Sequence, residues 1–468
     1  MKVRGEFFPK AGPMIQEKNR ALVTDLYELT MAACYFDNDM FEEATFSLFV
    51  RNYPPARRYF VAAGLEDVLQ YLVELRFEQE DLDYLESTEL FKPTFLSYLE
   101  KFRFSGDVDA LPEGRLFFAQ EPILEVTAPI IEAQIVETFI INAVNLQAMI
   151  ATKASRCVQV AGTRKLVDFS LRRTQGVDAG LKVARASFIG GFAGTSNVLA
   201  GKTYGLPVFG TMAHSFISSF EQEIDAFRAF AETFPQNTVL LVDTYETVAG
   251  TKKAVKVGKE MAKKGYRLKG VRLDSGDIAD LSKEVRLILK ESGLQDAIIF
   301  ASGAFDEHKI QEVIERGAEI DSFGVGTKMG VSADAPYLDM AYKLVSYGGQ
   351  PVLKLSPKKL SLPLAKQVFR LLTEQEKMEK DIIGLRDDRI QAGEPLLGKV
   401  MSHGRIIASL PALEEIKAVC HDEFLRLDDK YKTIGGEAEY FPVELSPRLE
   451  RLREAVITEV ERKELSGD

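Results

Sequence analysis

His214 is the residue whose type and position best suit chemistry in this chain. It lies in the stretch VFGTMAHSF, directly after a strand-like run at Val208 to Gly210 and directly before a predicted amphipathic helix at Ser215 to Phe234. The chain has only four histidines. An imidazole titrates near neutral pH and can act as a nucleophile. Its place at a strand-to-helix junction therefore indicates a reacting side chain rather than a packing one.

Polar or glycine residues follow the other predicted strands in the same way. Any one of them could simply cap the helix that comes next, because Asp and Ser are good N-caps. Because such residues follow nearly every predicted strand, we favour an active site formed by the strand ends. The residues concerned are Phe169, Arg172 and Arg173, Ser196 in GTSN, Thr211, Asp243, Arg272 and Asp274, Ser302 and Gly303, and the segment Gly324 to Lys328.

The segment GVGTK, Gly324 to Lys328, is the most specific candidate for a phosphate site. Glycines expose backbone N–H groups that favour an anion, and the segment follows the last predicted strand, where α/β barrels commonly hold a phosphate. The adjacent Arg172 and Arg173 could clamp a phosphate or carboxylate by bidentate pairing. A solvated surface pair is the alternative for these two arginines.

Asp243 and Asp274 are acidic residues at the ends of two predicted strands. Such groups could bind a ribose hydroxyl or the water ligands of magnesium. Capping of the helices that follow is the alternative.

Short apolar strands alternate with helices between Leu166 and Gly326, which indicates parallel βα units. Seven strands are more than a small open sheet uses, so the pattern predicts an irregular parallel α/β barrel with its active site at the carboxyl ends of the strands. The predicted strands are Leu166–Ser170, Ser187–Gly190, Val208–Met212, Thr238–Thr244, Gly270–Asp274, Ile298–Ser302 and Ser322–Gly326, and the helices between them include Thr247–Lys264, Ile278–Glu291 and Glu307–Arg316.

The two ends of the chain are predicted to form a second, α+β lobe. The expected domains are residues 1–125 for the N-terminal lobe, 126–347 for the barrel that carries the active site, and 348–468 for a C-terminal segment that returns to the N-terminal lobe. Helices are expected at Thr24–Phe36, Leu65–Leu75, Glu80–Phe102 and Ile131–Ala151, and strands at Thr45–Val50 and Tyr59–Ala63.

The bulk composition excludes several classes of protein. With 468 residues, 46% hydrophobic and 28% charged, the chain has the composition of a soluble globular enzyme. Its net charge of -11 argues against a nucleic-acid partner, because no basic excess neutralises phosphates. No apolar run is long enough to span a membrane. Its three cysteines are far apart in sequence, which favours a reducing compartment, and we expect a cytoplasmic protein.

Read together, these segments resemble nicotinate phosphoribosyltransferases. The resemblance covers most of the chain and rests on motifs that follow in the family's order. They are TDLYELTMA with Tyr27, EGRLFFAQEPILEVTAPIIEAQIVETFIIN, DFSLRRTQG, GGFAGTSNVLAGKTYGLPVFGTMAHSF, LLVDTYETVAG, GVRLDSGD, GVGTK and the tail PVLKLSPKKLSLPLAKQVFR. In that tail the chain has Leu364 after Pro363, where the family often has a glycine.

The resemblance implies a reaction. Nicotinate attacks phosphoribosyl pyrophosphate (PRPP) through its ring nitrogen, giving nicotinate mononucleotide and pyrophosphate. ATP hydrolysis drives the step through a phosphohistidine, which matches His214, and Mg²⁺ takes part. This is the first step of NAD synthesis from nicotinate. The family also implies a homodimer with shared active sites, in which Tyr27 of one subunit reaches the site of the other.

Roles for the site residues follow from the same resemblance. Asp243 and Asp274 join His214 as catalytic groups, and Asp274 would also hold magnesium through water. Tyr27, Phe169, Ser196, Thr211 and Arg272 would bind nicotinate. Phosphate and PRPP would be bound by Arg172, Arg173, Ser302, Gly303, Gly326, Thr327 and Lys328.

Ser196 favours the acid over the amide as substrate. The related enzymes that use nicotinamide carry an aspartate at the matching position of a GTDT-like motif. An aspartate would repel a carboxylate, whereas a serine can donate a hydrogen bond to it.

The alternative functions are an enzyme of the same fold that uses nicotinamide or quinolinate, a catalytically silent barrel that senses a nucleotide, and a barrel aldolase or isomerase. The aldolase is disfavoured because no lysine at a predicted strand end is clearly placed to form a Schiff base.

Overall fold

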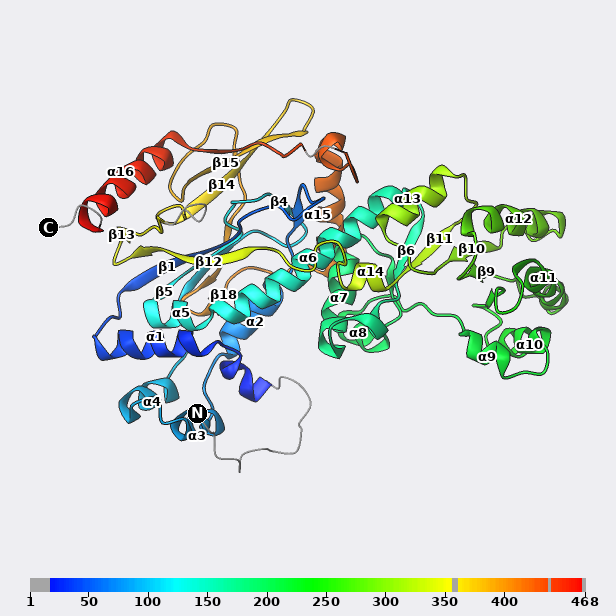
Figure 1. The fold of residues 1–468 in the computed structure, drawn as a ribbon, viewed down its shortest axis with the longest axis horizontal. Helices are drawn as coiled ribbons and strands as arrows, with labels where there is room; N and C mark the ends of the chain where they lie inside the picture. Colours follow the sequence, from blue (N-terminus) through cyan, green and yellow to red (C-terminus); the bar gives the residue numbers. More distant parts are fainter. Residues whose placement is uncertain (1–16, 356–360, 437–438, 465–468) are drawn as a thin grey trace. The chain divides into compact units, whose positions relative to one another are not determined.

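The computed structural model describes residues 17–355, 361–436 and 439–464. It divides into two compact units. The first combines Met1–Met149 with Tyr337–Asp468, and the second is Ile150–Pro336. Figure 1 colours both by sequence. The second unit holds every predicted site residue except Tyr27.

A sheet of six parallel strands forms the centre of the second unit, in the order β7-β6-β11-β10-β9-β8. Ligands of such sheets bind outside the carboxyl ends of the strands, which lie at one edge. The loops at that edge carry the predicted site residues. The strands are β6 (Lys165–Asp168), β7 (Gly194–Thr195), β8 (Val239–Leu241), β9 (Gly270–Leu273), β10 (Ile298–Ala301) and β11 (Ser322–Val325).

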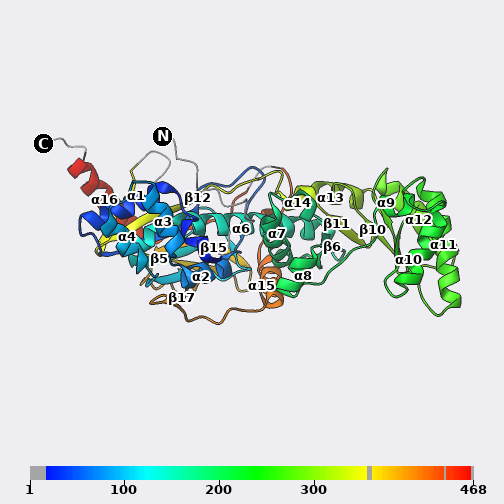
Figure 2. The same cartoon turned by 90° about the horizontal axis from the view of Figure 1, so that it is seen from below.

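Helices connect these strands, and the expected α11, α12 and α13 are confirmed to within one residue. Figures 1 and 2 show α10, α11 and α12 gathered beside β9 and β10. The helical segments of this unit are η2 (Leu171–Arg173), α7 (Val177–Ile189), α8 (Val198–Tyr204), α9 (His214–Ser218), α10 (Glu223–Thr233), α11 (Thr247–Lys263), α12 (Ile278–Glu291), α13 (Glu307–Glu315) and α14 (Thr327–Gly330).

The expected closed barrel is not found in residues 150–336, all of which are described; the class is mixed α/β with an open parallel sheet. The segment predicted as a strand at Val208–Met212 adds only one parallel bridge, from Val208 to Thr195. Val208 is 50% exposed and Phe209 40%. This segment therefore lacks the buried face that would fix it as a full strand.

Two further predictions for this unit are wrong. Ser187–Gly190 is not a strand but the end of α7, whose last turns are buried. A short apolar run does not distinguish a buried strand from a buried helix end. The single helix expected from Ser215 to Phe234 is instead α9 and α10, separated by four residues, Ser219 to Gln222.

Two main sheets form the first unit. The larger one has the order β13-β12-β1-β5-β3-β17-β18, and the smaller β16-β14-β15-β19. β12 pairs with β1 and β17 with β3, so the chain after residue 337 completes a sheet begun by the N-terminal part. The strands are β1 (Glu43–Val50), β2 (Phe60–Val61), β3 (Asp107–Ala110), β4 (Leu116–Phe117), β5 (Leu124–Pro129), β12 (Met340–Tyr347), β13 (Gln350–Pro351), β14 (Lys366–Leu372), β15 (Met378–Leu385), β16 (Glu394–Pro395), β17 (Gly398–Ser402), β18 (Arg405–Ile406) and β19 (Val443–Leu445).

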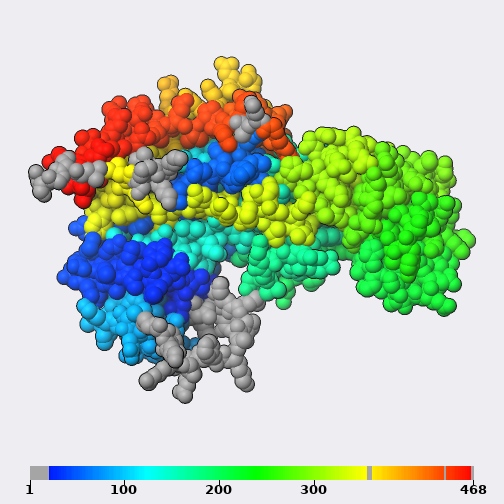
Figure 3. Space-filling model, in the orientation of Figure 1, coloured from blue at the N-terminus to red at the C-terminus, as the bar shows by residue number. Residues whose placement is uncertain are grey.

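Helices flank these sheets, and Figure 3 shows α1 (blue) and α16 (red) at the surface of the unit. The helix expected over Glu80–Phe102 is two helices, because Glu89 has a φ of 56° and Pro93 starts α4. None of the described helices is long and apolar enough to cross a membrane. The helices are η1 (Glu17–Leu22), α1 (Leu26–Asp37), α2 (Leu65–Glu74), α3 (Gln79–Ser87), α4 (Pro93–Glu100), α5 (Ile130–Ile135), α6 (Glu137–Ala161), α15 (Leu413–Arg426), η3 (Asp429–Tyr431) and α16 (Pro447–Glu464). The second half of α6, from Ile150, belongs to the second unit.

Leu364 takes the backbone conformation that a glycine would favour. Its φ is 60°, in the left-handed region that carries a steric cost for a side chain. The leucine side chain packs against a buried apolar cluster that contains Ile383, Leu385 and Leu449. The turn after Pro363 therefore keeps the glycine-type geometry, and apolar packing offsets part of the cost.

Glu28 is a buried acid at the junction of α1 and α6. Its side chain is fully buried. Oε1 accepts hydrogen bonds from the Thr138 backbone N–H at 3.0 Å and the Thr138 hydroxyl at 2.6 Å, and Oε2 accepts one from the Thr24 hydroxyl. Burial raises the pKa of the Glu28 carboxyl from 4.5 to about 7 despite these bonds, and the Glu137 charge adds to the rise.

We predict that Glu28→Gln changes how stability depends on pH. A carboxyl with a raised folded-state pKa favours folding when protonated, so its contribution is lost as the pH rises from 4.5 through about 7. The shift corresponds to about 3 kcal/mol, at 1.36 kcal/mol per pKa unit. Between pH 5 and pH 8 the wild type should lose about this much unfolding free energy relative to the variant in urea titrations. A difference between the two proteins that is constant across this range would contradict the prediction.

Candidate active site

Arg272, at the third position of β9, is the centre of the site. Its side chain is 16% exposed. Nη2 donates to Asp274 Oδ1 at 2.7 Å and Nε donates to Ser302 Oγ at 2.8 Å. Nη1 donates to Thr211 Oγ1 and to the Met212 carbonyl oxygen, each at 3.2 Å. One guanidinium thus joins the ends of β9 and β10 to the loop before α9, and brings four predicted site residues together.

Asp274 and Asp243 place two carboxylates beside this guanidinium. Burial would raise the pKa of the Asp274 carboxyl, but hydrogen bonds from Ser302 and Arg272 and the Arg272 charge outweigh it and hold that pKa below its usual value. Asp243 Oδ2 accepts from the Asp274 backbone N–H at 2.8 Å and from the Ser275 hydroxyl at 2.7 Å. Asp243 Oδ1 is buried and has no hydrogen-bond partner among the described residues. A buried, unpaired carboxylate oxygen suits a ligand hydroxyl or a hydrated cation.

His214 is the first residue of α9, and its side chain is 45% exposed. Nδ1 lies 3.1 Å from the Thr244 hydroxyl oxygen, and Nε2 lies 3.8 Å from Asp274 Oδ2. A hydroxyl therefore holds one ring nitrogen while a carboxylate faces the other. The ring is accessible, and Asp274 would stabilise positive charge that develops on it. Thr244 was not predicted as a site residue; its position directly after Asp243 at a strand end was the available signal.

Phe169 presents its ring to the same guanidinium. The Arg272 Cζ atom lies 5.6 Å from the ring centroid, and the Phe300 ring centroid lies 5.5 Å away. A Cβ atom on Gly324 would come within 2.8 Å of the Phe169 ring, so the glycine makes room for it. An aromatic face beside a cation can receive a flat ring that carries a negative group. Ser196 is half-buried at the end of the neighbouring β7.

Gly303 lies directly against the strand end that carries Asp274. Its φ is 108°, and an added Cβ atom would lie 2.2 Å from the Asp274 carbonyl oxygen. Only glycine fits this backbone position without displacing Asp274. Ser302 before it is buried, and its hydroxyl donates to Asp274 Oδ1. The β10 end is thereby fixed to the β9 end.

The GVGTK segment ends β11 and forms α14. Gly326 is the N-cap of this short helix, and Thr327 and Lys328 are exposed. Lys328 Nζ lies 2.8 Å from Oδ2 of Asp306, the N-cap of α13, so the segment is linked to the loop after β10. Burial would raise the pKa of the Asp306 carboxyl, but hydrogen bonds from Lys328 and the Lys309 backbone hold it below its usual value. Asp306 was also not predicted.

Arg172, Arg173 and Tyr27 are not part of this cluster of contacts. Arg172 and Arg173 are exposed on η2, directly after β6. Tyr27 belongs to α1 of the first unit and is 47% exposed. Burial and the charge of Glu137 raise the pKa of the Tyr27 phenol, which keeps its hydroxyl protonated.

Asp243 and Asp274 fit only a weakly held magnesium ion. Among the described residues no set of three or more His, Cys, Asp or Glu side chains gathers in a metal-binding arrangement. Mg²⁺ usually keeps several waters and takes one or two carboxylates plus substrate phosphate oxygens. The unpaired Asp243 Oδ1 matches that pattern, whereas Asp274 Oδ1 is already bonded to Arg272 and Ser302.

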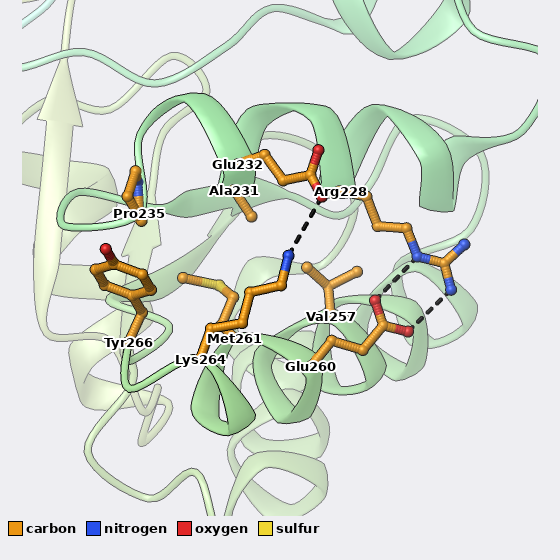
Figure 4. A pocket seen from close by; sticks show the side chains of 9 residues that line it. All are labelled: Arg228, Ala231, Glu232, Pro235, Val257, Glu260, Met261, Lys264 and Tyr266. Carbon is orange, nitrogen blue, oxygen red and sulfur yellow. Dashed lines mark hydrogen bonds and ion pairs between the residues drawn. The ribbon is translucent and has the colours of Figure 1, made fainter.

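A cavity of about 160 Å³ lies between α10 and α11 and is lined by none of the predicted site residues. Its charged walls pair with each other: Arg228 with Glu260 at 2.9 Å and Lys264 with Glu232 at 3.3 Å. Figure 4 shows these pairs facing one another across the two helices. These pairs link the two helices, whereas the predicted site residues gather at the strand ends, which we therefore take as the candidate active site.

Comparison with known proteins identifies the family. Three family models match in order: the nicotinate phosphoribosyltransferase N-terminal domain over residues 22–145, the nicotinate phosphoribosyltransferase family over 164–367 and the C-terminal domain over 391–453. The chain belongs to the nicotinate phosphoribosyltransferase family, as its ordered motifs predicted. It is therefore a phosphoribosyl-transferring enzyme.

Individual relatives agree with this assignment. The chain is 44% identical over 446 residues to a nicotinate phosphoribosyltransferase of Mycobacterium tuberculosis, covering 94% of this chain and 96% of the relative. It is 37% identical to the nicotinate phosphoribosyltransferase of Bacillus subtilis, with 92% and 94% covered. The solved structure of human nicotinic acid phosphoribosyltransferase matches with a TM-score of 0.83 at 30% identity, covering 92% of this chain and 99% of that one.

Proposed function

We propose that the chain transfers the phosphoribosyl group of PRPP to the ring nitrogen of nicotinate, giving nicotinate mononucleotide and pyrophosphate, as the first step of NAD synthesis from nicotinate. The observation that carries this proposal is the Arg272 guanidinium, 5.6 Å from the Phe169 ring centroid. That pair offers one surface for a flat ring and one charge for its carboxylate. The names of the relatives support the same substrate. The cytoplasmic location and the lack of a nucleic-acid partner stay predictions.

Nicotinate would lie against Phe169, with Tyr27 on its other face. Arg272 has five N–H donors, and its bonds to protein atoms leave at least one for the carboxylate. Thr211 and Ser196 would add hydroxyl donors. This arrangement holds the ring nitrogen in line with C1 of PRPP, and such alignment is a large part of the rate enhancement that an enzyme can supply.

PRPP would be bound by the loops after β10 and β11. Gly303, Gly326 and Thr327 would supply backbone N–H groups and a hydroxyl, Lys328 an ammonium that also pairs with Asp306, and the exposed Arg172 and Arg173 further positive charge. Ser302, whose N–H and hydroxyl donate to Leu273 and Asp274, would hold the loop in place. Asp243 and Asp274 would orient the ribose hydroxyls. When bound through its waters, Mg²⁺ would neutralise charge on the departing pyrophosphate.

His214 would couple ATP hydrolysis to this transfer. A neutral ring nitrogen attacks the γ-phosphorus of ATP, an N–P bond forms, and the bond to the bridging oxygen breaks as ADP leaves with its electron pair. Water later releases the phosphoryl group as phosphate. The added negative charge beside Arg272 and Asp274 would change the affinity for PRPP and its products. The exposed, hydroxyl-held ring supports this role.

We further propose a homodimer with shared active sites. Tyr27 is about half exposed on α1, and Phe169 directly follows β6 in the other unit of the chain. A second subunit would bring its Tyr27 to the ring site of the first.

The choice of acceptor tests the function. Purified enzyme with PRPP, ATP and Mg²⁺ should release pyrophosphate with nicotinate at a kcat/KM at least about a hundredfold above that with nicotinamide, because only the acid pairs with Arg272. Parallel assays with quinolinate complete the comparison. Equal efficiency with nicotinamide would falsify the assignment of the acid as substrate.

The phosphoryl step is tested by mass spectrometry after incubation with ATP alone. We expect an acid-labile phosphate on His214, and none in His214→Ala. The variant should keep a slow transfer that ATP no longer stimulates, because the ring and phosphate sites remain intact. His403→Ala, at an exposed turn of the other unit, is the matched control and should behave as the wild type. An unmodified His214 in an enzyme whose turnover ATP still accelerates would rule out this coupling.

A further inference from the structure

Asp168 is a buried carboxylate at the carboxyl end of β6. Asp168 is only 1% exposed to solvent. Among the described residues no cation forms an ion pair with it, and burial raises the pKa of the carboxyl against the hydrogen bonds that it accepts. A buried carboxylate without a counter-ion is costly unless hydrogen bonds satisfy it. A buried carboxylate of this kind is expected to have a role other than packing.

The two oxygens of Asp168 bind two different chain segments. Oδ1 accepts from the Ser170 backbone N–H at 2.8 Å and from the Ser170 hydroxyl at 2.5 Å. Oδ2 accepts from the Thr195 hydroxyl at 2.7 Å, on the neighbouring β7. The carboxylate therefore clamps the turn after its own strand and, at the same time, the end of the next strand.

The first of these segments carries Phe169. The bond from Asp168 to Ser170 spans this residue and closes a local turn around it. The Phe169 backbone N–H donates to the Val325 carbonyl oxygen at 2.9 Å, which continues the pairing with β11. The turn and the strand pairing together direct the ring toward Gly324 and Arg272.

The second segment carries Ser196. Its backbone N–H donates to the Asp168 carbonyl oxygen at 2.8 Å. The Thr195 hydroxyl that donates to Asp168 also accepts from the Asn197 backbone N–H at 3.0 Å. Ser196 therefore lies between Thr195 and Asn197, and the positions of both depend on the Asp168 carboxylate.

We propose that Asp168 is a positioning residue that sets two of the nicotinate contacts, the Phe169 ring and the Ser196 hydroxyl. The inference rests on the proposed function, which assigns those two residues to nicotinate. Asp168 itself does not touch the substrate. Its removal should therefore weaken nicotinate binding more than PRPP binding, because of the proposed PRPP ligands only Arg172 and Arg173 directly follow the Ser170 turn.

Asp168→Asn tests the proposal, because the amide retains the size and one acceptor oxygen but turns an NH₂ group toward Thr195. We expect the Kd for nicotinate, measured by calorimetry on the full chain, and the KM for nicotinate to rise about tenfold or more. The KM for PRPP should change much less than the KM for nicotinate, because its proposed ligands in the loops after β10 and β11 do not contact Asp168. Asp321→Asn is the control: Asp321 precedes β11, and its exposed carboxylate accepts from the Ile299 backbone N–H at 2.7 Å and pairs with Arg286, so the variant reports the loss of a structural carboxylate at the opposite end of the same sheet.

A second pair of variants covers the case in which Asp168→Asn does not fold. Thr195→Val removes the hydroxyl and should raise the nicotinate KM, and Thr195→Ser should restore it. Unchanged nicotinate affinity in Asp168→Asn, or equal losses for nicotinate and PRPP in Asp168→Asn and Thr195→Val, would overturn the inference. A wild type that does not bind nicotinate would instead refute the proposed function, and with it the premise of this inference.

Discussion

The placement of one guanidinium organises the candidate active site. Arg272 is largely buried, and a buried cation needs partners around it. Those partners come from the β9 end, the β10 end and the loop before α9, so satisfying the charge also fixes three segments that carry site residues. Asp274 keeps a lowered pKa because of this contact, and its second oxygen is left to face His214. The pairing thus sets the positions of Asp274, Ser302 and Thr211, and through Asp274 it adds to the setting of His214.

The parallel sheet makes this arrangement possible. β9, β10, β11 and β6 are consecutive neighbours, so their carboxyl ends lie along one edge. Glycines at Gly303 and Gly324 allow the backbone of β10 and the ring of Phe169 to approach closely. The first unit, by contrast, is a pair of mainly antiparallel sheets completed by the C-terminal segment. It carries Tyr27 on α1, held in place by the buried Glu28 beside it.

Periodicity and strand-end chemistry predicted the part of the fold that depends on local pattern. The helices at Thr247, Ile278 and Glu307 begin where polar caps precede amphipathic repeats, and they were found at those residues. The strand predicted at Ser187–Gly190 is wrong because a segment of four residues is too short to show a helical or a strand period. The predicted barrel closure is wrong because a count of strands does not show closure: the exposed residues Val208 and Phe209 lie in a segment that joins the sheet by a single bridge.

The site residues that the sequence did not predict are those that act by positioning other residues. Asp168 and Thr195 are 27 positions apart, and only the pairing of β6 with β7 reveals that they meet. Thr244 and Asp306 likewise gain their roles from contacts with His214 and Lys328 that no local pattern encodes. Motif resemblance located residues that match a family, whereas the contacts that position those residues required the structure.

Nicotinate affinity of Arg272→Lys tests the central claim most directly. Lysine keeps the positive charge but lacks the planar fork that reaches Asp274, Ser302 and Thr211 together. If the guanidinium organises the site, titration calorimetry should show nicotinate binding weakened by about thirtyfold or more, although the charge is preserved. Wild-type affinity in this variant would contradict the account, because charge alone would then suffice.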